Sequence, residues 1–208
     1  MPLTDAQICT LALNRVGEKQ PLGSLNDATN AGRLCKLVYP LARDGALEEF
    51  PWPFARRRAA LALLADDEDD AEARENTGYA YVYALPSDCL VPRYLETGLL
   101  NPAEDQKIPF ELEDDADQST GVLLTNQEDA ELVYTWRVTE TAKFTPLFAD
   151  ALAWRVAYEL CFSLPVKPAV GERAMQMYQM KVAEAAASTQ RHAQLAPKPK
   201  PLSVRARR

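Results

Sequence analysis

The chain has 208 residues, of which 47% are hydrophobic and 25% are charged. This composition is typical of a soluble globular protein, and the length allows one good core, or one core with a smaller satellite. The net charge of −7 argues against a general nucleic-acid-binding surface, and no apolar run approaches the roughly 18 residues that can span a membrane.

The start of the chain and its cysteines indicate the compartment. Residues 1–5 lack the basic and apolar regions of a signal peptide, so we expect synthesis and folding in the cytoplasm. The cysteines are widely spaced and contain no C-x-x-C pair, so small buried thiols are expected and disulfides and zinc are disfavoured. The four positions are Cys9, Cys35, Cys89 and Cys161.

Two helices are predicted in the first fifty residues. Thr4 is a good N-cap, apolar residues follow at helical spacing, and Gly17 supplies the stop. Asn26-Asp27 is a candidate N-cap for a second amphipathic helix, in which Pro40 predicts a kink or a break and which ends before Pro51. Its apolar stripe consists of Ala31, Leu34, Cys35, Val38 and Ala42.

The segment after the second helix joins two kinds of structure. Pro51 and Pro53 bracket Trp52, and each proline disfavours helix at the residue before it. Trp52 and Phe54 need an apolar surface. We therefore expect these two aromatic side chains at a hinge between helices and strands, or at a subunit contact.

Three consecutive arginines, Arg56, Arg57 and Arg58, lead into the first predicted strand. Strand alternation puts Arg56 and Arg58 on one face and Arg57 on the other. Basic residues beside aromatic ones can bind single-stranded nucleic acid, but the net acidic charge favours salt bridges to another subunit, with the acidic loops as candidate partners.

The middle of the chain has the period of two that is typical of β-strands. Five or six short strands at hairpin spacing predict an antiparallel arrangement, and Pro109 marks its strand as an edge. The predicted strands lie within 59–63, 79–85, 90–95, 108–113, 121–125 and 131–138.

Helices return after residue 144. Thr145 is a predicted N-cap followed by Pro146, and residues 147–161 are apolar nearly all round, which predicts a central position in a bundle. Pro165 and Pro168 break this helix, and residues 170–185 predict a last amphipathic helix. Beyond about residue 195 the chain is rich in Pro, Lys and Arg, which predicts an extended arm.

The order of these elements predicts an α+β protein. We expect a four-helix bundle from both chain ends, with an inserted antiparallel β-sheet region and an extended C-terminal arm. The predicted domains are a helical bundle of residues 1–54 and 144–194, a β domain of residues 55–143, and the arm of residues 195–208.

The catalytic inventory is thin. The single histidine, His192, is expected to be a solvated surface residue, and neither a G-x-S-x-G motif nor a glycine-rich phosphate loop is present. We therefore expect no catalytic, cofactor-binding or metal-binding residues. An enzyme that uses acidic residues has the least support.

One acidic run invites a calcium hypothesis. It fails the pattern of a calcium-binding loop, because Ala71 and Thr77 stand where glycine and glutamate are needed. Five adjacent acids repel one another unless they are solvated, so an exposed loop is expected. The run is Asp66, Asp67, Glu68, Asp69 and Asp70.

The basic C-terminal arm is the other candidate site. Alternating prolines stiffen it, and its two small apolar side chains can anchor it in a groove or on a sheet edge of a partner. It could also contact phosphates. Its candidate docking residues are Pro197, Lys198, Leu202, Val204, Arg205, Arg207 and Arg208.

Several of these segments together resemble a known family. The set resembles the tail tubular protein A group of head-to-tail adaptors from tailed phages, over roughly residues 5–190. No single motif is diagnostic; the ordered set with its spacing carries the likeness. The matching segments are Ile8–Gly17, Ala31–Phe50, Trp52–Ala55 with Arg58 and Leu61, Tyr83–Leu90, Leu132–Tyr134 and Phe144–Leu160.

The resemblance implies a structural ring, by family analogy a dodecamer, in the neck of the virion after synthesis in the host cytoplasm. The implied partners are the portal protein and a tail nozzle or tail tube protein, with no membrane. The helical bundle would meet the portal and neighbouring subunits, and the sheet region would face the tail.

Genomic DNA would pass through the lumen of this ring without sequence readout, and an acidic surplus in the lumen or its loops suits a sliding polyanion. The family brings no catalytic residues and no role for the arm, which we expect to dock on the portal. The alternative is a DNA-binding packaging or head-completion factor that uses the basic arm.

Overall fold

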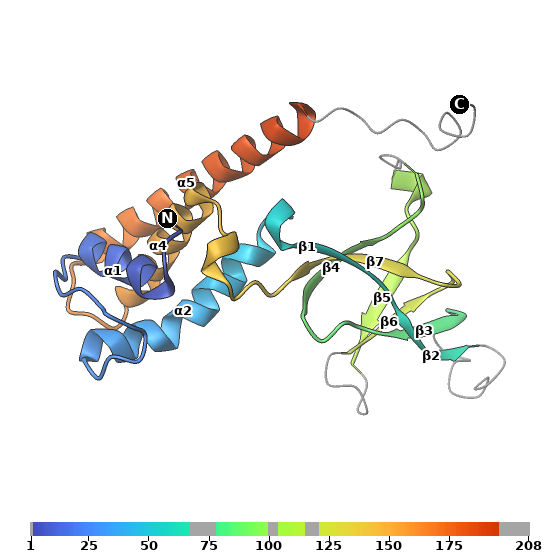
Figure 1. Cartoon of the computed structure of the whole chain (residues 1–208), viewed down its shortest axis with the longest axis horizontal. Coiled ribbons are helices and arrows are strands. Elements are labelled where there is room, and N and C mark those ends of the chain that lie inside the picture. The colour runs from blue at the N-terminus through green and yellow to red at the C-terminus, as the bar shows by residue number, and fades with distance from the viewer. Residues whose placement is uncertain (1, 67–77, 100–103, 115–120, 196–208) are drawn as a thin grey trace. The chain divides into compact units, whose positions relative to one another are not determined.

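The computed structural model describes residues 2–66, 78–99, 104–114 and 121–195. The chain divides into two compact units, each described separately below (Figure 1). The helical unit comprises Met1–Arg43 and Glu140–Arg208, and the β unit comprises Asp44–Thr139. The described residues form α-helices and two antiparallel sheets, so the predicted α+β class is confirmed.

Helix α1 (Asp5–Val16) begins and ends as its sequence predicts. Thr4 Oγ1 accepts a hydrogen bond from the Gln7 N–H at 3.2 Å, and the Thr4 N–H donates to Gln7 Oε1 at 2.9 Å. This capping box satisfies two N–H groups that lack partners within the helix. Gly17 ends the helix in the left-handed region, with φ of 97°, a conformation that glycine adopts without a steric penalty.

Helix α2 (Asn30–Glu48) continues through Pro40, so the alternative of a break there is wrong. Its N-cap is Thr29, whose Oγ1 accepts from the Gly32 N–H at 3.1 Å. The prediction of Asn26-Asp27 is wrong because the Asp27 carboxylate is used in the preceding loop, where it accepts from the Gly23 N–H at 2.9 Å. The helix passes from the helical unit into the β unit between Arg43 and Asp44.

Helices α4 (Pro146–Leu160) and α5 (Pro168–Leu195) complete the described helices. Thr145 caps α4 by accepting from the Phe148 N–H at 3.2 Å. Helix α4 packs against both α1 and α5 (Figure 1). Its buried residues are Phe148, Ala149, Ala151, Leu152, Ala153, Val156, Ala157 and Leu160.

The helical unit also brings α1 and α2 together at two cysteines. Cys9 on α1 and Cys35 on α2 are buried free thiols. The hydrogen bond with Cys35, followed by burial, raises the pKa of Cys9.

Cys161, half-buried, donates a hydrogen bond from Sγ to the Ala157 carbonyl at 3.2 Å. All four cysteines are free thiols.

The β unit contains two antiparallel sheets (Figure 1). The three-stranded sheet has the order β1 (Arg56–Ala60), β7 (Glu131–Trp136) and β4 (Cys89–Leu95). The four-stranded sheet has the order β2 (Ala62–Asp66), β3 (Tyr81–Ala84), β6 (Val122–Thr125) and β5 (Phe110–Glu113). Strand β5 is an edge strand directly after Pro109, as predicted.

Short 3₁₀ turns occur at Pro53–Ala55 (η1), Glu104–Gln106 (η2) and Thr141–Lys143 (η3). The core of the β unit lies on the two central strands β6 and β7, whose residues are buried on both faces except for Glu131. None of the described helices is both long and apolar enough to cross a membrane.

Candidate functional site

The Trp52 side chain lies at the C-terminal end of α2, within the β unit. Only 1% of Trp52 is exposed, and its indole Nε1 donates to the Ala46 carbonyl at 2.9 Å. The Phe50 ring meets it edge-on at 4.9 Å, and the Phe54 ring stacks at 6.0 Å. The expected apolar surface for Trp52 and Phe54 is therefore built from this segment and the end of the helix that precedes it.

Arg93 on β4 covers the remaining carbonyls at this helix end. Its Nη2 donates to the Glu48 carbonyl at 2.9 Å and to the Leu47 carbonyl at 3.4 Å, while Nε donates to Thr135 Oγ1 on β7 at 2.9 Å. Burial lowers the pKa of the Arg93 guanidinium, and Glu48 opposes this shift. A cation at the C-terminus of a helix is also favoured by the helix dipole.

Trp52 and Arg93 therefore satisfy three successive carbonyl groups of α2, at Ala46, Leu47 and Glu48. Arg137 adds a salt bridge to Asp44 at 3.0 Å. These bonds join the last turns of α2 to the three-stranded sheet. The compact units divide at 43/44 and 139/140, whereas the boundaries expected from the sequence are 54/55 and 143/144.

Arg57 packs on the other side of the strand pair from Arg56 and Arg58, as alternation predicts. Its guanidinium lies 3.6 Å from the centre of the Trp136 ring and forms an ion pair with Asp88. Asp88 Oδ1 also accepts from the Tyr134 hydroxyl at 3.0 Å. Burial, and then the contact with Asp88, raise the pKa of Tyr134 to about 12.

The other two arginines differ in their surroundings. Arg58 pairs with Glu96 at 3.3 Å, so Arg57 and Arg58 both have acidic partners within the chain. Arg56 is exposed, and no ion pair of Arg56 occurs among the described residues. Salt bridges from this cluster to another subunit stay a prediction, which now depends mainly on Arg56.

The helical unit contains an open apolar cavity of ≈ 640 Å³ at the connection between α4 and α5. Phe162 is 74% exposed at this cavity, and its ring meets Tyr158 edge-on at 5.1 Å. Two charged residues, Lys167 and Glu172, also line it. The full lining is Tyr158, Cys161, Phe162, Val166, Lys167, Pro168, Gly171, Glu172 and Met175.

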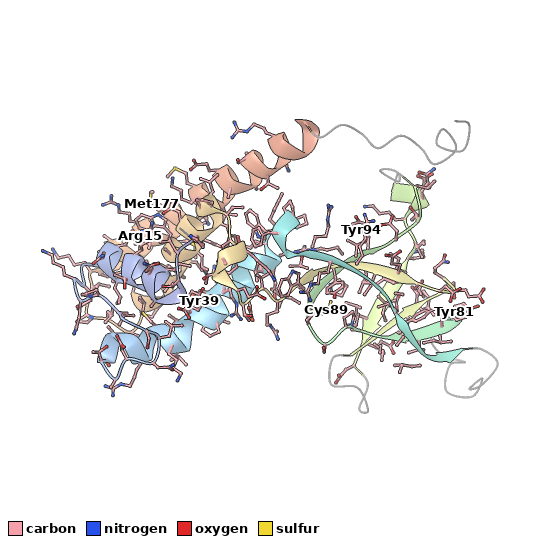
Figure 2. The ribbon with its side chains drawn as sticks, in the orientation of Figure 1. Arg15, Tyr39, Tyr81, Cys89, Tyr94 and Met177 are labelled. Atoms are coloured by element: carbon pink, nitrogen blue, oxygen red, sulfur yellow. The ribbon has the colours of Figure 1, made fainter. Side chains whose placement is uncertain are left out.

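A second, smaller hollow of ≈ 440 Å³ lies between α1, α4 and the start of α5. Arg15 of α1, labelled in Figure 2, lines this hollow, and its guanidinium lies 4.1 Å from the centre of the Trp154 ring. The same guanidinium pairs with Asp150. Burial lowers the pKa of Arg15, and Asp150 opposes that shift. Arg15 is therefore paired within the unit, and a second cation, the exposed Arg173, also lines the hollow.

A ridge of leucines lies exposed on α2 in the helical unit. Leu37 is 74% exposed and Leu41 is 67% exposed, while Leu34 on the same stripe is half-buried. Residues at this spacing share one side of a helix. The opposite side buries Cys35, Tyr39 and Ala42, so α2 presents apolar residues on two sides. The sequence analysis assigned Leu34 to the core stripe and did not single out Leu37 and Leu41.

Two predicted sites fall outside the described residues. The acidic residues 67–70 and the arm residues 197–208 belong to this group, and the side chain of Asp66, the last residue of β2, is also outside the description. His192 belongs to α5, without a described side chain. Within the described ranges, no three His, Cys, Asp or Glu residues gather in a way that could hold a metal ion.

No protein-family model matches this chain, and no curated protein matches its sequence.

Proposed function

We propose that the chain is a structural head-to-tail adaptor of a tailed phage, similar to the tail tubular protein A group. It forms a ring, by family analogy of twelve copies, that joins the portal to the tail and lets genomic DNA pass through its lumen. The observation that carries the proposal is the order of elements. A helical unit from both chain ends is interrupted by an inserted antiparallel β unit.

The segments that carry the resemblance also occur at element junctions, which supports the proposal. The Ile8–Gly17 stretch covers most of α1 and its C-cap, Trp52 closes α2, and Pro146 opens α4. Such junctions restrict the sequence more tightly than helix middles do, because caps and turns need particular residue types. A four-helix bundle made by α1, α2, α4 and α5 belongs to the same proposal.

A ring also needs apolar surface that a single subunit leaves uncovered, and the helical unit has it. Exposed Leu37, Leu41 and Phe162 lie on the surface of this unit. Large apolar side chains on a soluble protein commonly mark a protein interface when they form contiguous patches. We assign the helical unit to contacts with neighbouring subunits and the portal, and the β unit to the tail nozzle or tail tube protein.

In this proposal the protein acts in the virion neck and has no catalytic step. We expect the acidic run 66–70 in the lumen or in a loop, where its negative charge avoids strong attraction to the DNA and lets the DNA slide. The C-terminal arm docks on the portal through Leu202, Val204 and its basic residues. In this proposal the arm is the portal-binding segment of a chain that is otherwise acidic.

The test is the mass of the purified full-length chain, alone and after mixing with the cognate portal ring. Light scattering coupled to size exclusion measures both. We expect about one adaptor copy for each portal subunit, which by family analogy is a twelvefold ring. If the chain does not bind the portal at micromolar concentrations, the proposal is wrong.

One observation favours the alternative of a DNA-binding packaging or head-completion factor. The C-terminal arm contains Lys198, Lys200, Arg205, Arg207 and Arg208 and no acidic residue. Such a cluster suits phosphate contacts. The remaining net charge disfavours this alternative, since the protein as a whole repels a polyanion.

A further inference from the structure

We propose that the leucine ridge of α2, made by Leu34, Leu37 and Leu41, seats in the α4–α5 cavity of a second copy of this chain. This inference rests on the proposed ring and deepens it, because it names the two surfaces that meet between neighbouring subunits. The ridge and the cavity both belong to the helical unit.

The ridge has the spacing of a helix that binds in a groove. Leu34, Leu37 and Leu41 follow the i, i+3, i+7 pattern by which an amphipathic helix inserts its apolar anchors into a partner. Leu37 and Leu41 are the two most exposed leucines of the described chain. Their transfer from water to an apolar cavity is favourable by about 1.5–3 kcal/mol for each side chain that becomes fully buried.

The cavity offers a matching surface. Its lining is mainly apolar, from Cys161, Phe162, Val166 and Met175, and its ≈ 640 Å³ is open to the outside. Phe162 is exposed at its edge, so an incoming helix would cover that ring as well. Aromatic residues and methionine are enriched at protein interfaces for this reason.

A leucine ridge that fills this cavity has to be the ridge of another copy. The ridge and the cavity lie on the same compact unit, and in that unit Leu37 and Leu41 are exposed, so the ridge does not fill its own cavity. A contact between two different surfaces of identical chains is heterologous, and such contacts generate rings when the rotation closes. The proposed function requires a contact of this class.

Charge complementarity determines the orientation of the leucine ridge in the cavity of the second copy. Arg33 is exposed one turn before Leu37 on α2, and Glu172 is exposed at the cavity. The cavity also carries Lys167, five residues away from Glu172. Pairing Arg33 with Glu172, and away from Lys167, fixes which end of the ridge lies at which end of the cavity.

A native cysteine allows a direct test. Cys161 is a free thiol that lines the cavity, so Leu41→Cys and Leu37→Cys each bring a second thiol to it if the ridge of a neighbour sits there. The full-length variants, assembled on the portal ring, are treated with a short bis-maleimide. We expect covalent dimers and higher multimers on a denaturing gel. Adding Cys161→Ser must abolish them.

The matched control is Leu112→Cys on β5, an exposed leucine (49%) in the other unit, which should give no ladder. A charge-reversal cycle is the second test. Arg33→Glu and Glu172→Arg should each weaken the association of copies about tenfold, and the double variant should recover most of it. Thermal unfolding of each variant should match the wild type, because both residues are exposed.

The outcomes separate the two proposals. A full ring on the portal that yields no Cys161-dependent multimers, and no rescue in the charge-reversal cycle, overturns the ridge-in-cavity contact and leaves the adaptor proposal standing. A wild-type chain that forms no ring with the portal overturns the adaptor proposal, and this contact with it. Multimers that require both thiols establish the contact.

Discussion

At the scale of single residues, Trp52 is the side chain on which the end of α2 depends. It is buried, stacks with two phenylalanines and donates to a helix carbonyl. Trp52→Ala removes the largest fully buried side chain, so the free energy of unfolding should fall by about 3–5 kcal/mol in urea titrations of the full-length chain.

The conservative variant separates packing from hydrogen bonding. Trp52→Phe keeps an aromatic ring but leaves the Ala46 carbonyl without its donor, so a smaller loss of about 1–3 kcal/mol is expected. A near-neutral result for Trp52→Ala would contradict the burial described here. It would return Trp52 to the role of a residue reserved for a subunit contact.

Arg93 makes a second residue-scale prediction. Arg93→Met keeps the apolar stem and removes the donors to the Leu47 and Glu48 carbonyls and to Thr135 Oγ1. We expect a loss of about 1–2 kcal/mol in unfolding free energy, because part of the site is open to water. The measurement is the same urea titration.

Arg137→Met is the control for Arg93, since the Arg137 side chain is half exposed and its partner is the single carboxylate of Asp44. Surface pairs of this kind contribute about 0–1 kcal/mol. Equal losses for the two variants would show that Arg93 acts as an ordinary surface charge rather than as a cap of α2.

The contrast between Trp52 and Arg93 shows how far sequence reasoning reaches at this scale. The two prolines beside Trp52 are a local signal, so a helix end with buried aromatics could be predicted. Arg93 lies 45 residues from the carbonyl it caps, and Arg57 lies 31 residues from Asp88. Pairings of this range depend on sheet register, which local patterns do not determine.

At the scale of elements, the contribution of the helix caps to the free energy of unfolding can be measured. Thr4 makes both hydrogen bonds of the α1 capping box. Thr4→Ala removes the Oγ1 acceptor of the Gln7 N–H and leaves the backbone donor in place, so it should lower the unfolding free energy of the helical unit by about 1 kcal/mol, observed by circular dichroism during thermal unfolding. Thr4→Ser keeps the hydroxyl and should stay near the wild type. A loss as large as that of the alanine variant would exclude capping as the cause.

Element prediction succeeded where the deciding groups are adjacent in the chain. The caps at Thr4, Gly17 and Thr145 follow directly from residue type. The start of α2 was misplaced because Asp27 and Thr29 are both good caps, and the loop bond from Gly23 to Asp27 decides between them. The predicted strand within 59–63 is divided, because β1 pairs with β7 and β2 pairs with β3 in another sheet.

At the scale of the whole molecule, described helices from the N-terminal and C-terminal parts of the chain belong to one unit. Helix α4 packs on α1, and the β unit lies between them in the sequence. The insertion of a β region between two helical segments could be predicted from the sequence, because it depends only on the order of the elements along the chain. Which surfaces remain exposed depends on packing, and the ridge of Leu37 and Leu41 had no separate signal.

The C-terminal arm gives the first whole-molecule prediction. Deleting Pro197–Arg208 removes no residue of the described helices and strands, so the melting temperature should be unchanged. Under the adaptor proposal, the same deletion weakens attachment to the portal, measured by co-sedimentation with portal rings. Portal binding at the wild-type level by the truncated chain would show that the arm has no docking role.

DNA binding gives the last prediction and separates the two proposed functions. An adaptor of net charge −7 should show no measurable affinity for a duplex at 150 mM salt, because the acidic protein as a whole repels the like-charged DNA. A packaging factor should bind, and its affinity should fall steeply as salt rises from 50 to 200 mM because each phosphate contact releases counterions. Fluorescence anisotropy of a labelled duplex across that salt range measures both. The arm-deleted chain is the matched control: steep salt-dependent binding that vanishes with the arm favours the packaging factor, and its absence in both chains favours the adaptor.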